Sequence, residues 1–529
     1  MKRFFVLLIL GIAAVTGVFA AGNSAAKSGG KTFTVAINGD ITSMDPAYVY
    51  DYSSNVVGFQ IFETLLTYDA NNNLIPYLAE SWRAVDNLTY VYKIRGDVKF
   101  SDGTPLTADD VVFSIENARK EESYVAWMFA AVESVTQTGN LEVTVKLNSP
   151  SASWPHVLAT AGGVISKAYY QKHQSDFGTA KGGILATGAY IFDHWTSGQE
   201  IALKRNSNYW NKQISPYFDT IVYKIIPDDN TRVTALRTGE VDYMENPPLD
   251  LLPVINADQN LATVNYKSFS VVFFAFNTQR APFTDVNIRK AIYHALDLES
   301  LHRNIIKEGG TIATVLPQGE GLYGTRPQDW RNYLAGAPKY DYNLDTARSL
   351  LAASSMPNGF KFSLITNEDS LRNSMALFIQ DSLAKLNIQV EIVKVSDDEH
   401  TEYQFGGVLK DGKRDYDSIL AGWTADYPDV GNNIEPLFAA DQAGEGGTNS
   451  AAYANPQVDT LIKQENALTD ENARNQAIFQ ALDVITAEVP YIFITYPNRR
   501  IVHNRKWSGV NIYSAAMAQT FKFYNIQPR

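Results

Sequence analysis

Two hydrophobic periods interleave along nearly the whole chain, and this alternation restricts the possible folds more than any other feature. In short segments the apolar residues occupy every second position, which is typical of half-buried strands. These segments are 33–37, 89–95, 141–147, 200–205, 220–226 and 389–393. Between them, a helical period or an N-terminal cap indicates helices after Thr107 and over 285–296, 345–353, 370–386 and 457–487. The sequence therefore predicts an α/β fold.

The length of the chain adds a division into lobes. Single hydrophobic cores stop growing near about 250–300 residues, and this chain has 529. It contains no cysteine, so its core alone must supply the stability. No repeat period and no Pro/Ser-rich linker interrupts the pattern. We therefore expect lobes that are joined by closely packed crossing strands and not by a tether.

The first residues predict export. Lys2 and Arg3 precede an apolar run over 4–15, and the predicted secretory signal peptide ends at Ala20. Residues 21–31 are rich in Gly, Ser and Ala, which is typical of a flexible leader. A lipid anchor would need a cysteine after the signal peptide, and the chain has none. We therefore expect a free periplasmic protein.

Charge and composition narrow the range of partners. The formal charge is −12 at pH 7, or −14 once Lys2 and Arg3 are removed, which argues against nucleic acid as a partner. The chain holds 29 Tyr and 8 Trp. Because Tyr and Trp give large contact areas at low entropic cost, part of this excess is expected to line a ligand cleft.

The usual catalytic and metal-binding patterns do not occur in the sequence. No two of the seven histidines, at positions 156, 173, 194, 294, 302, 400 and 503, have metal-ligand spacing. The absence of cysteine excludes thiol nucleophiles, and there is no G-x-S-x-G motif. We therefore predict no metal site, no cofactor and no enzymatic activity.

One acidic and aromatic turn stands out, AGWTADYPD over 421–429. Asp426 and Asp429 could form the carboxylate pair of a secreted glycoside hydrolase, which needs carboxyl groups about 5–10 Å apart. A second interpretation is a solvated turn in which the acids only cap the backbone. A third is a clamp for a positively charged ligand.

Dispersed segments of the chain carry a resemblance to one protein family. They are SMDP at 43–46, IFETLLTY at 61–68, IPYLAESW at 75–82, VKFSDGTPLTADDV at 98–111, TGAY at 187–190, NYW at 208–210, ALRTGEVD at 235–242, NTQRAPFTDVNIRKA at 277–291 and GWTADYPD at 422–429. In this order they resemble the large solute-binding proteins of ABC importers, in the peptide and nickel class. The resemblance extends over almost the whole chain after the leader.

The resemblance implies a bilobal α/β clam of the type II periplasmic-binding-protein class with an extra inserted domain. Lobe I would comprise 32–62, 187–275 and 504–529. The inserted domain II would comprise 63–186, and lobe III, which closes over the ligand, would comprise 276–503.

The resemblance also implies a ligand anchor in the acidic turn. In peptide-binding members, the aspartate three residues after the tryptophan pairs with the α-ammonium of the ligand, and that position here is Asp426. Trp423 would pack beside the ligand. The backbones of Gly422 and Thr424 would bond to its main chain as an added strand, which ignores side-chain identity. A buried carboxylate is costly alone and favourable when a cation arrives.

Further positions follow from the same resemblance. The stretch Tyr50 to Tyr52 would form the opposing wall from lobe I, and Asn246 would line the site. Arg372, at the start of a predicted helix, would bind the carboxylate of the peptide. Some long-peptide members have arginine at the position of Leu420, so the preferred ligand length stays open.

The implied function is to bind short peptides between two lobes and deliver them to ABC permease subunits in the inner membrane. Closure around the ligand would signal occupancy. We expect a monomer with no nucleic-acid partner. One alternative keeps the scaffold but binds an oligosaccharide, or a nickel or haem complex. The minor alternative is the glycoside hydrolase.

Overall fold

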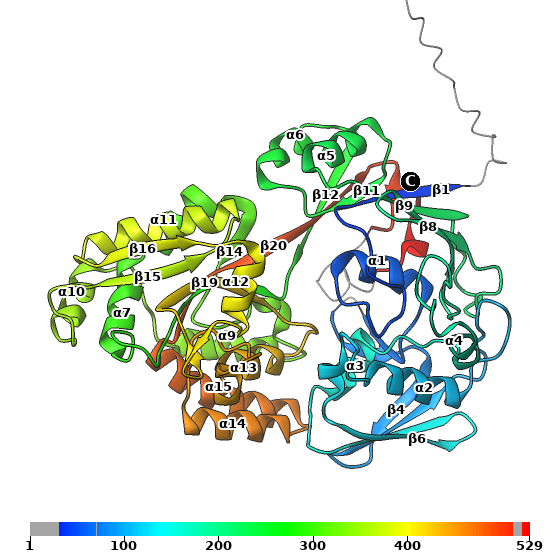
Figure 1. Cartoon of the computed structure of the whole chain (residues 1–529), viewed down its shortest axis with the longest axis horizontal. Coiled ribbons are helices and arrows are strands. Elements are labelled where there is room, and N and C mark those ends of the chain that lie inside the picture. Colours follow the sequence, from blue (N-terminus) through cyan, green and yellow to red (C-terminus); the bar gives the residue numbers. More distant parts are fainter. Residues whose placement is uncertain (1–30, 70, 511–520) are drawn as a thin grey trace, which may run out of the picture.

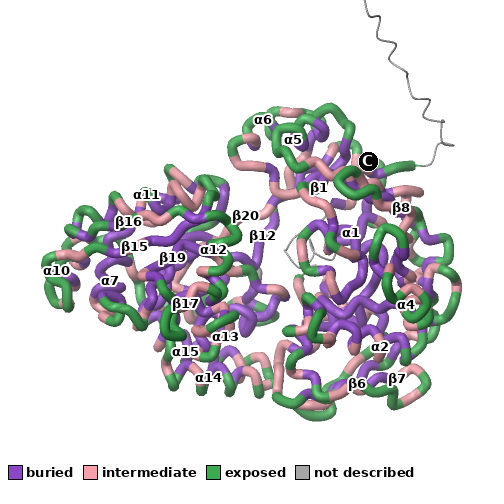
Figure 2. The backbone as a smooth tube through the Cα atoms, in the orientation of Figure 1, coloured by how far each residue is buried: buried purple, intermediate pink, exposed green. Residues whose placement is uncertain are grey.

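The protein folds into two bodies that lie side by side (Figure 1). The computed structural model describes residues 31–69, 71–510 and 521–529, so the predicted signal peptide and leader residues 21–30 lie outside the described residues. Buried residues fill the interior of each body (Figure 2). The bilobal α/β prediction is confirmed. No described helix is both long and apolar enough to cross a membrane.

One twelve-stranded sheet runs through both bodies, in the order β16-β15-β19-β13-β20-β11-β1-β10-β9-β8, with β12 and β14 also paired to β20. Its strands are β1 (Thr32–Ile37), β8 (Tyr190–Thr196), β9 (Glu200–Arg205), β10 (Thr220–Ile225), β11 (Tyr243–Glu245), β12 (Leu261–Lys267), β13 (Ser270–Phe276), β14 (Gly310–Ile312), β15 (Lys361–Thr366), β16 (Gln389–Lys394), β19 (Ser418–Thr424) and β20 (Tyr491–Asn504). Parallel pairs such as β1 with β10 coexist with antiparallel ones.

The bodies are connected by strands that cross from one to the other. The first part of β20 pairs with β13, as Ile492 with Phe274, and its last part pairs with β12, as Ile501 with Val264. The chain from β12 into β13 makes the same crossing in the opposite direction (Figure 1). The helices α5 (Asp229–Thr238) and α6 (Leu252–Asn256) lie above these crossing strands.

The first body holds β1, β8, β9 and β10 together with a four-stranded sheet in the order β4-β5-β7-β6. Its other elements are β2 (Leu66–Tyr68), β3 (Leu74–Pro76), β4 (Ala79–Ala84), β5 (Thr89–Ile94), β6 (Val132–Gly139), β7 (Glu142–Leu147), α1 (Tyr52–Ile61), α2 (Ala108–Ala118), α3 (Trp154–Thr160) and α4 (Lys167–His173). One hydrophobic core joins Phe33, Phe100 and Phe523, which lie far apart in the sequence. The boundaries expected for lobe I and the inserted domain stay predictions.

The second body has a core on each face of its part of the sheet. Alternation along β13 places Val271 and Phe273 in one core and Phe274 and Phe276 in the other. The covering helices are α7 (Val286–Ala295), α8 (Leu298–Leu301), α9 (Pro327–Gly336), α10 (Leu344–Ala352), α11 (Ser370–Ala384), α12 (Asp397–Gln404), α13 (Gly431–Phe438), α14 (Pro456–Asn466) and α15 (Glu471–Glu488). Two short antiparallel strand pairs complete the described elements: β17 (Leu409–Lys410) with β18 (Lys413–Arg414), and β21 (Trp507–Ser508) with β22 (Gln527–Pro528).

The predicted strands are confirmed, as is the cap at Thr107. The Thr107 hydroxyl accepts the Asp110 backbone N–H at 3.3 Å, and the Asp110 carboxylate accepts the Thr107 N–H at 3.0 Å. The single helix predicted over 457–487 is wrong, because α14 and α15 are separate. Asp470 caps the second helix by accepting the Ala473 N–H at 2.8 Å.

Candidate ligand-binding site

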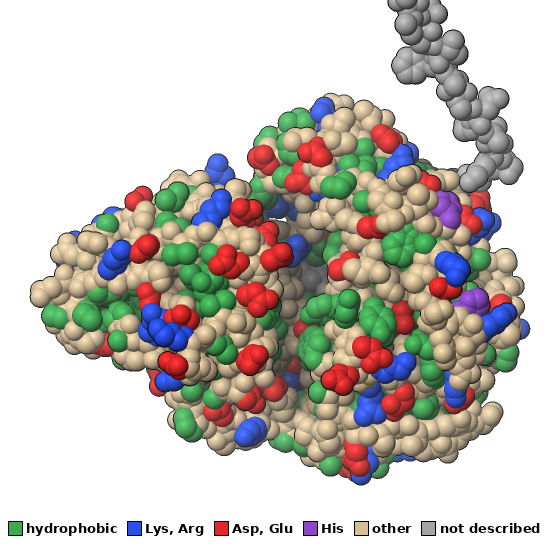
Figure 3. Space-filling view, viewed as in Figure 1, with side chains coloured by type: hydrophobic (Ala, Val, Ile, Leu, Met, Phe, Trp, Pro, Cys, Tyr) green, Lys and Arg blue, Asp and Glu red, His purple; other side chains and the backbone are tan. Residues whose placement is uncertain are grey.

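A groove separates the two bodies (Figure 3). Acidic side chains lie along it, and a group of hydrophobic side chains lies on the wall formed by the first body. The second body turns the carboxyl ends of the parallel strands β15 and β19 toward helices α11 and α12. In α/β sheets ligands bind at the carboxyl ends of strands. The turn after β19 is the acidic turn of the sequence.

Asp426 connects this turn to the opposite body. The Tyr50 hydroxyl donates to Oδ1 of Asp426 at 3.0 Å, across 376 positions of sequence. Burial raises the pKa of Asp426 to about 6, although Tyr50 and Asn432 act in the other direction by donating to it. No described basic side chain forms an ion pair with Asp426. Asp426 is therefore a half-buried carboxylate that forms no ion pair with the described residues.

The turn that carries Asp426 is held by Asn432, which the sequence interpretation missed. The Asp426 backbone N–H donates to the Asn432 side-chain oxygen at 2.6 Å. The indole N–H of Trp423 donates to the Asn432 carbonyl at 2.9 Å. The only sequence signal was an amide residue near the start of α13. Trp423 is half-buried and packs against the core of the second body.

Gly422 and Thr424 lie on an open edge of β19. The Leu420 carbonyl accepts from His400 Nε2 at 3.0 Å, and the Gly422 carbonyl accepts from Gln404 Nε2 at 2.6 Å. Alternate residues of a strand face the same edge, so the Thr424 backbone faces it too. Gln404 thus occupies the Gly422 carbonyl, and the described pairing of β15 with β19 extends only to Ile419.

Arg372 lies close to Gly422. A Cβ atom added to Gly422 would be 3.5 Å from Nη2 of Arg372. The Arg372 guanidinium also lines a hollow of about 450 Å³ that includes Asn367 and Asp397. Burial lowers the pKa of Arg372, while the charges of Asp369 and Asp397 act in the opposite direction. A basic group thus stands beside the glycine of the turn.

Tyr52 and Asn246 lie by the crossing strands. Tyr52 is 40% exposed, and its hydroxyl interacts with the Glu245 carboxylate. Asn246 has a positive φ of 46° and exchanges hydrogen bonds with the backbone of Arg500, at 2.8 and 3.2 Å. The structure thus places a hydrogen bond between Tyr50 and Asp426 and brings the Arg372 guanidinium close to Gly422. Asn246 bonds instead to the backbone of Arg500.

Asp429 is a structural acid, and the hydrolase pair is wrong. Both Asp429 oxygens bond to the Arg474 guanidinium, with Nη2 at 2.7 Å from Oδ1. Burial opposes ionisation of Asp429, but Arg474 outweighs it and holds the pKa below its usual value. Glu465 accepts from Arg474 Nε at 2.6 Å. A carboxylate fixed in this way has no free oxygen to serve as a base or nucleophile.

The same turn also contacts the first body. The His156 ring stacks between those of Tyr68 and Tyr427, with both centroid distances at 5.8 Å. Tyr427 and Ser153 bring their hydroxyl oxygens to 3.3 Å. The turn therefore combines an unpaired carboxylate with contacts that hold the bodies together.

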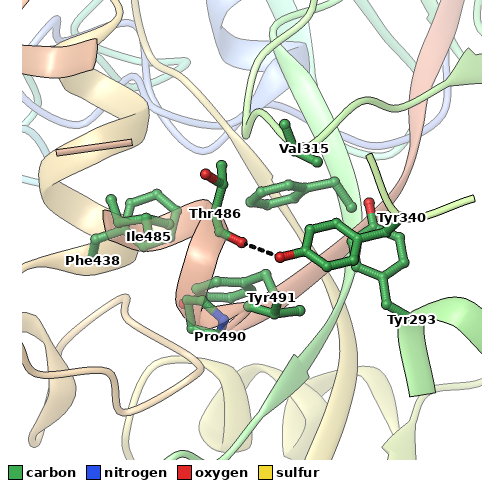
Figure 4. A pocket seen from close by; sticks show the side chains of 10 residues that line it. Tyr293, Val315, Tyr340, Phe438, Ile485, Thr486, Pro490 and Tyr491 are labelled. Atoms are coloured by element: carbon green, nitrogen blue, oxygen red, sulfur yellow. Dashed lines mark hydrogen bonds between the residues drawn. The ribbon is translucent and has the colours of Figure 1, made fainter. Parts of the chain in front are cut away.

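A further hollow of the second body offers little room. One of them, lined by Tyr293, Tyr340 and Tyr491 among others, has a volume of about 10 Å³, and the Tyr340 hydroxyl donates to the Thr486 carbonyl beside it at 2.7 Å (Figure 4). Such a volume holds about one water molecule. Within the described ranges, no group of three His, Cys, Asp or Glu side chains could hold a metal ion.

Two α/β bodies that are joined by crossing strands and separated by a groove are the architecture of the bilobal solute-binding proteins. The sequence profile of the family "Bacterial extracellular solute-binding proteins, family 5 Middle" matches residues 73–445, and the chain belongs to this family. It is thus a non-enzymatic solute-binding protein of the peptide and nickel class of ABC importers.

The chain is similar to known proteins over almost its full length and almost theirs. The chain is 28% identical to the oligopeptide-binding protein AppA of Bacillus subtilis, over 95% of this chain and 94% of AppA. It is 27% identical to the glutathione-binding protein GsiB of Pectobacterium atrosepticum, over 90% and 91%. The structure of DppA from Helicobacter pylori with the peptide STSA superposes with a TM-score of 0.76 at 24% identity, covering 94% of this chain and 98% of DppA. These proteins bind peptides or related ligands.

Proposed function

We propose that the protein binds short peptides in the groove and delivers them, from the periplasm, to the permease of an ABC importer. The observation that carries this proposal is the Asp426 carboxylate, which bonds across the groove to Tyr50 but has no cation partner among the described residues. A peptide α-ammonium supplies that partner. Charge-assisted hydrogen bonds of this kind are stronger than neutral ones.

The other residues of the turn complete a peptide site in this proposal. Trp423 packs against the ligand, and the open edge of β19 at Gly422 and Thr424 pairs with its main chain. Arg372, 3.5 Å from the Cβ position of Gly422, takes the carboxylate end. Tyr50 and Tyr52 form the facing wall. We further propose that the protein acts as a monomer without a nucleic-acid partner, consistent with its charge of −12.

The test begins with mass spectrometry of ligands that copurify with the protein, followed by calorimetric titration of di- to pentapeptides. We expect free-amine peptides to bind and their N-acetylated forms to bind at least about 100-fold more weakly, because losing one partner of a buried ion pair costs about 3–5 kcal/mol. Asp426→Asn is expected to cause the same loss. The matched control Asp345→Asn changes a carboxylate that is 96% exposed and is expected to leave affinity unchanged.

Equal affinity for free and acetylated peptides would overturn the role of Asp426. Amidation of the peptide C-terminus tests Arg372 separately, since it removes only the carboxylate. Unchanged affinity after amidation would exclude Arg372 as the carboxylate anchor.

An oligosaccharide is the second candidate ligand, because exposed aromatic rings flank the site. Tyr50 is 48% exposed and meets the 48% exposed Trp127 edge-to-face at 6.3 Å. Exposed rings of this kind offer contact surfaces to sugars as well as to peptide side chains. Copurified sugar, or copurified nickel or haem, together with no response to peptides would favour these ligands over peptides.

A further inference from the structure

The crossing part of the twelve-stranded sheet consists of β11, β12 and β20, and its two faces have different surroundings. On one face Met244 and Val502 pack with residues of α5 and α6 in a hydrophobic cluster. Side chains alternate along strands, so Glu245 lies on the opposite face. Tyr243 and Tyr266 on that face belong to the core of the first body. Helix α1 lies beneath this face, beside the space between the bodies (Figure 1).

Glu245 is surrounded by tyrosine hydroxyls. Tyr243 donates to its Oε1 at 2.8 Å, and Tyr266 donates to its Oε2 at 3.3 Å. The hydroxyl of Tyr52 also interacts with this carboxylate. Burial raises the pKa of Glu245 despite these donors and the nearby charge of Arg499. Glu245 is nevertheless half-buried and not fully enclosed.

Two other buried carboxylates, Asp429 and Glu63, have more complete sets of hydrogen-bond partners than Glu245 has. Asp429 is locked by Arg474. Glu63 is only 1% exposed and accepts from Tyr77, Tyr209 and Trp210. Glu245 has neither complete burial nor, among the described residues, a basic side chain at ion-pair distance. A carboxylate has about four acceptor positions, so acceptor capacity remains beyond the three hydroxyls.

Asp426 and Glu245 each contact one tyrosine of a short segment, Tyr50 just before helix α1 and Tyr52 at the first residue of that helix. Tyr50 donates to Asp426, and Tyr52 interacts with Glu245. Asp51, between the two tyrosines, is extended with φ −73° and ψ 159°. The two carboxylates are therefore bonded to side chains that lie only two positions apart in the chain.

We propose that Glu245 is a second cation-binding group of the cleft and selects ligands that carry a basic group in addition to the α-ammonium. The ligand class is short peptides with a lysine-like or arginine-like side chain near the amino end. This inference rests on the proposed peptide-binding function. The tyrosine hydroxyls orient the carboxylate before the ligand arrives, and the charge of Arg499 acts on Glu245 although the described residues include no ion pair between the two.

The experiment compares lysine with norleucine, which has the same chain length and no charge. Calorimetric titration uses alanine peptides of the length that binds best, with lysine or norleucine placed at each position in turn. At one position we expect the lysine peptide to bind about tenfold tighter or more, since partly buried ion pairs contribute on this scale. Glu245→Gln is expected to abolish that preference and leave the Kd of the all-alanine peptide within about twofold. Glu240→Gln, at a carboxylate that is 57% exposed, is the matched control.

Two results would overturn the inference while leaving peptide binding intact. One is equal affinity for lysine and norleucine peptides at every position in the unmodified protein, a comparison that does not depend on how any variant folds. The other is a lysine preference that survives in a folded Glu245→Gln protein. Failure of all peptides to bind would instead overturn the proposed function itself.

Discussion

Acidification from pH 7.5 to pH 5 is expected to weaken peptide binding about tenfold, because Asp426 becomes protonated. Asp426 is half-buried, and burial raises its pKa to about 6 in the ligand-free protein. Only the ionised carboxylate attracts an ammonium group. The α-amino group of a peptide has a pKa near about 8, so it remains charged over this range. Below pH 6 a proton must therefore leave Asp426 before the ligand can pair with it.

The magnitude follows from the position of that pKa. If the bound ammonium holds the pKa well below 5, the affinity falls by the factor 1 + 10^(6 − pH), which is about 11 at pH 5 and about 1.1 at pH 7. The factor at pH 5 corresponds to about 1.4 kcal/mol. The sign is fixed, because a ligand that prefers the deprotonated form always lowers the pKa of its partner. Binding at pH 5 should accordingly release about 0.9 proton per peptide.

Calorimetry measures both the loss of affinity at low pH and the number of protons released on binding. The Kd of one peptide is measured between pH 5 and pH 7.5, and at pH 5 in two buffers with different ionisation enthalpies, which reports the proton released. Asp426→Asn removes the titrating group, so its weaker binding is expected to be independent of pH. An affinity of the unmodified protein that stays constant from pH 7.5 to pH 5 would refute the role of Asp426, as would a pH dependence that persists in the asparagine variant.

Three further predictions use the same residues. Asp426→Asn should stabilise the ligand-free protein at pH 7.5 by about 1–2 kcal/mol in urea unfolding, a figure discounted from the full pKa shift for partial exposure. A carboxyl group with a raised pKa destabilises the fold as the pH rises from 3.8 to about 6, so the gain should vanish at pH 4. An equal gain at both pH values would contradict this prediction. Arg474→Met should cost about 3–5 kcal/mol in the same melts by leaving Asp429 and Glu465 unpaired, and a loss below about 1 kcal/mol would show that the network is dispensable. Gly422→Ala places a Cβ 3.0 Å from the Val271 carbonyl and 3.5 Å from Arg372, so peptide affinity should fall while the melting temperature changes little; unchanged affinity would separate Gly422 from the site.

Local signals explain why most elements were predictable. The alternation over 33–37 depends on the residues themselves, and the cap at Thr107 is made with Asp110, three residues away. The break between α14 and α15 was missed because the helical period continues across it. Asp470 alone marked the new start, and an isolated aspartate also occurs inside helices.

The chemistry of the site depends on partners far apart in the sequence, which no local pattern reveals. Asp426 and Asp429 look alike in the turn, yet one meets Tyr50 from 376 positions away and the other meets Arg474 from 45 positions away. The resemblance to a family could point to Asp426, but it could not show that the Tyr50 side chain bonds to it. Glu245 gave no sequence signal, because its tyrosine neighbours come from α1, β11 and β12.

The bond between Tyr50 and Asp426 bears on how closure is coupled to the ligand. A ligand shifts the balance between open and closed forms only by its differential affinity for the two. Tyr50 belongs to the first body and Asp426 to the second, so their bond exists only when the bodies approach. When the bodies are close, the Tyr50 hydroxyl occupies one acceptor position of the Asp426 carboxylate and leaves the others for an ammonium group. In the proposed function that ion pair then forms with less water around it than in an open form. His156, stacked between Tyr68 of the first body and Tyr427 of the second, adds contact area that forms in the same movement. In the proposed function, recognition of the cation and closure of the groove are therefore one event at this turn, and we expect a ligand without the cation to lose affinity and closure together.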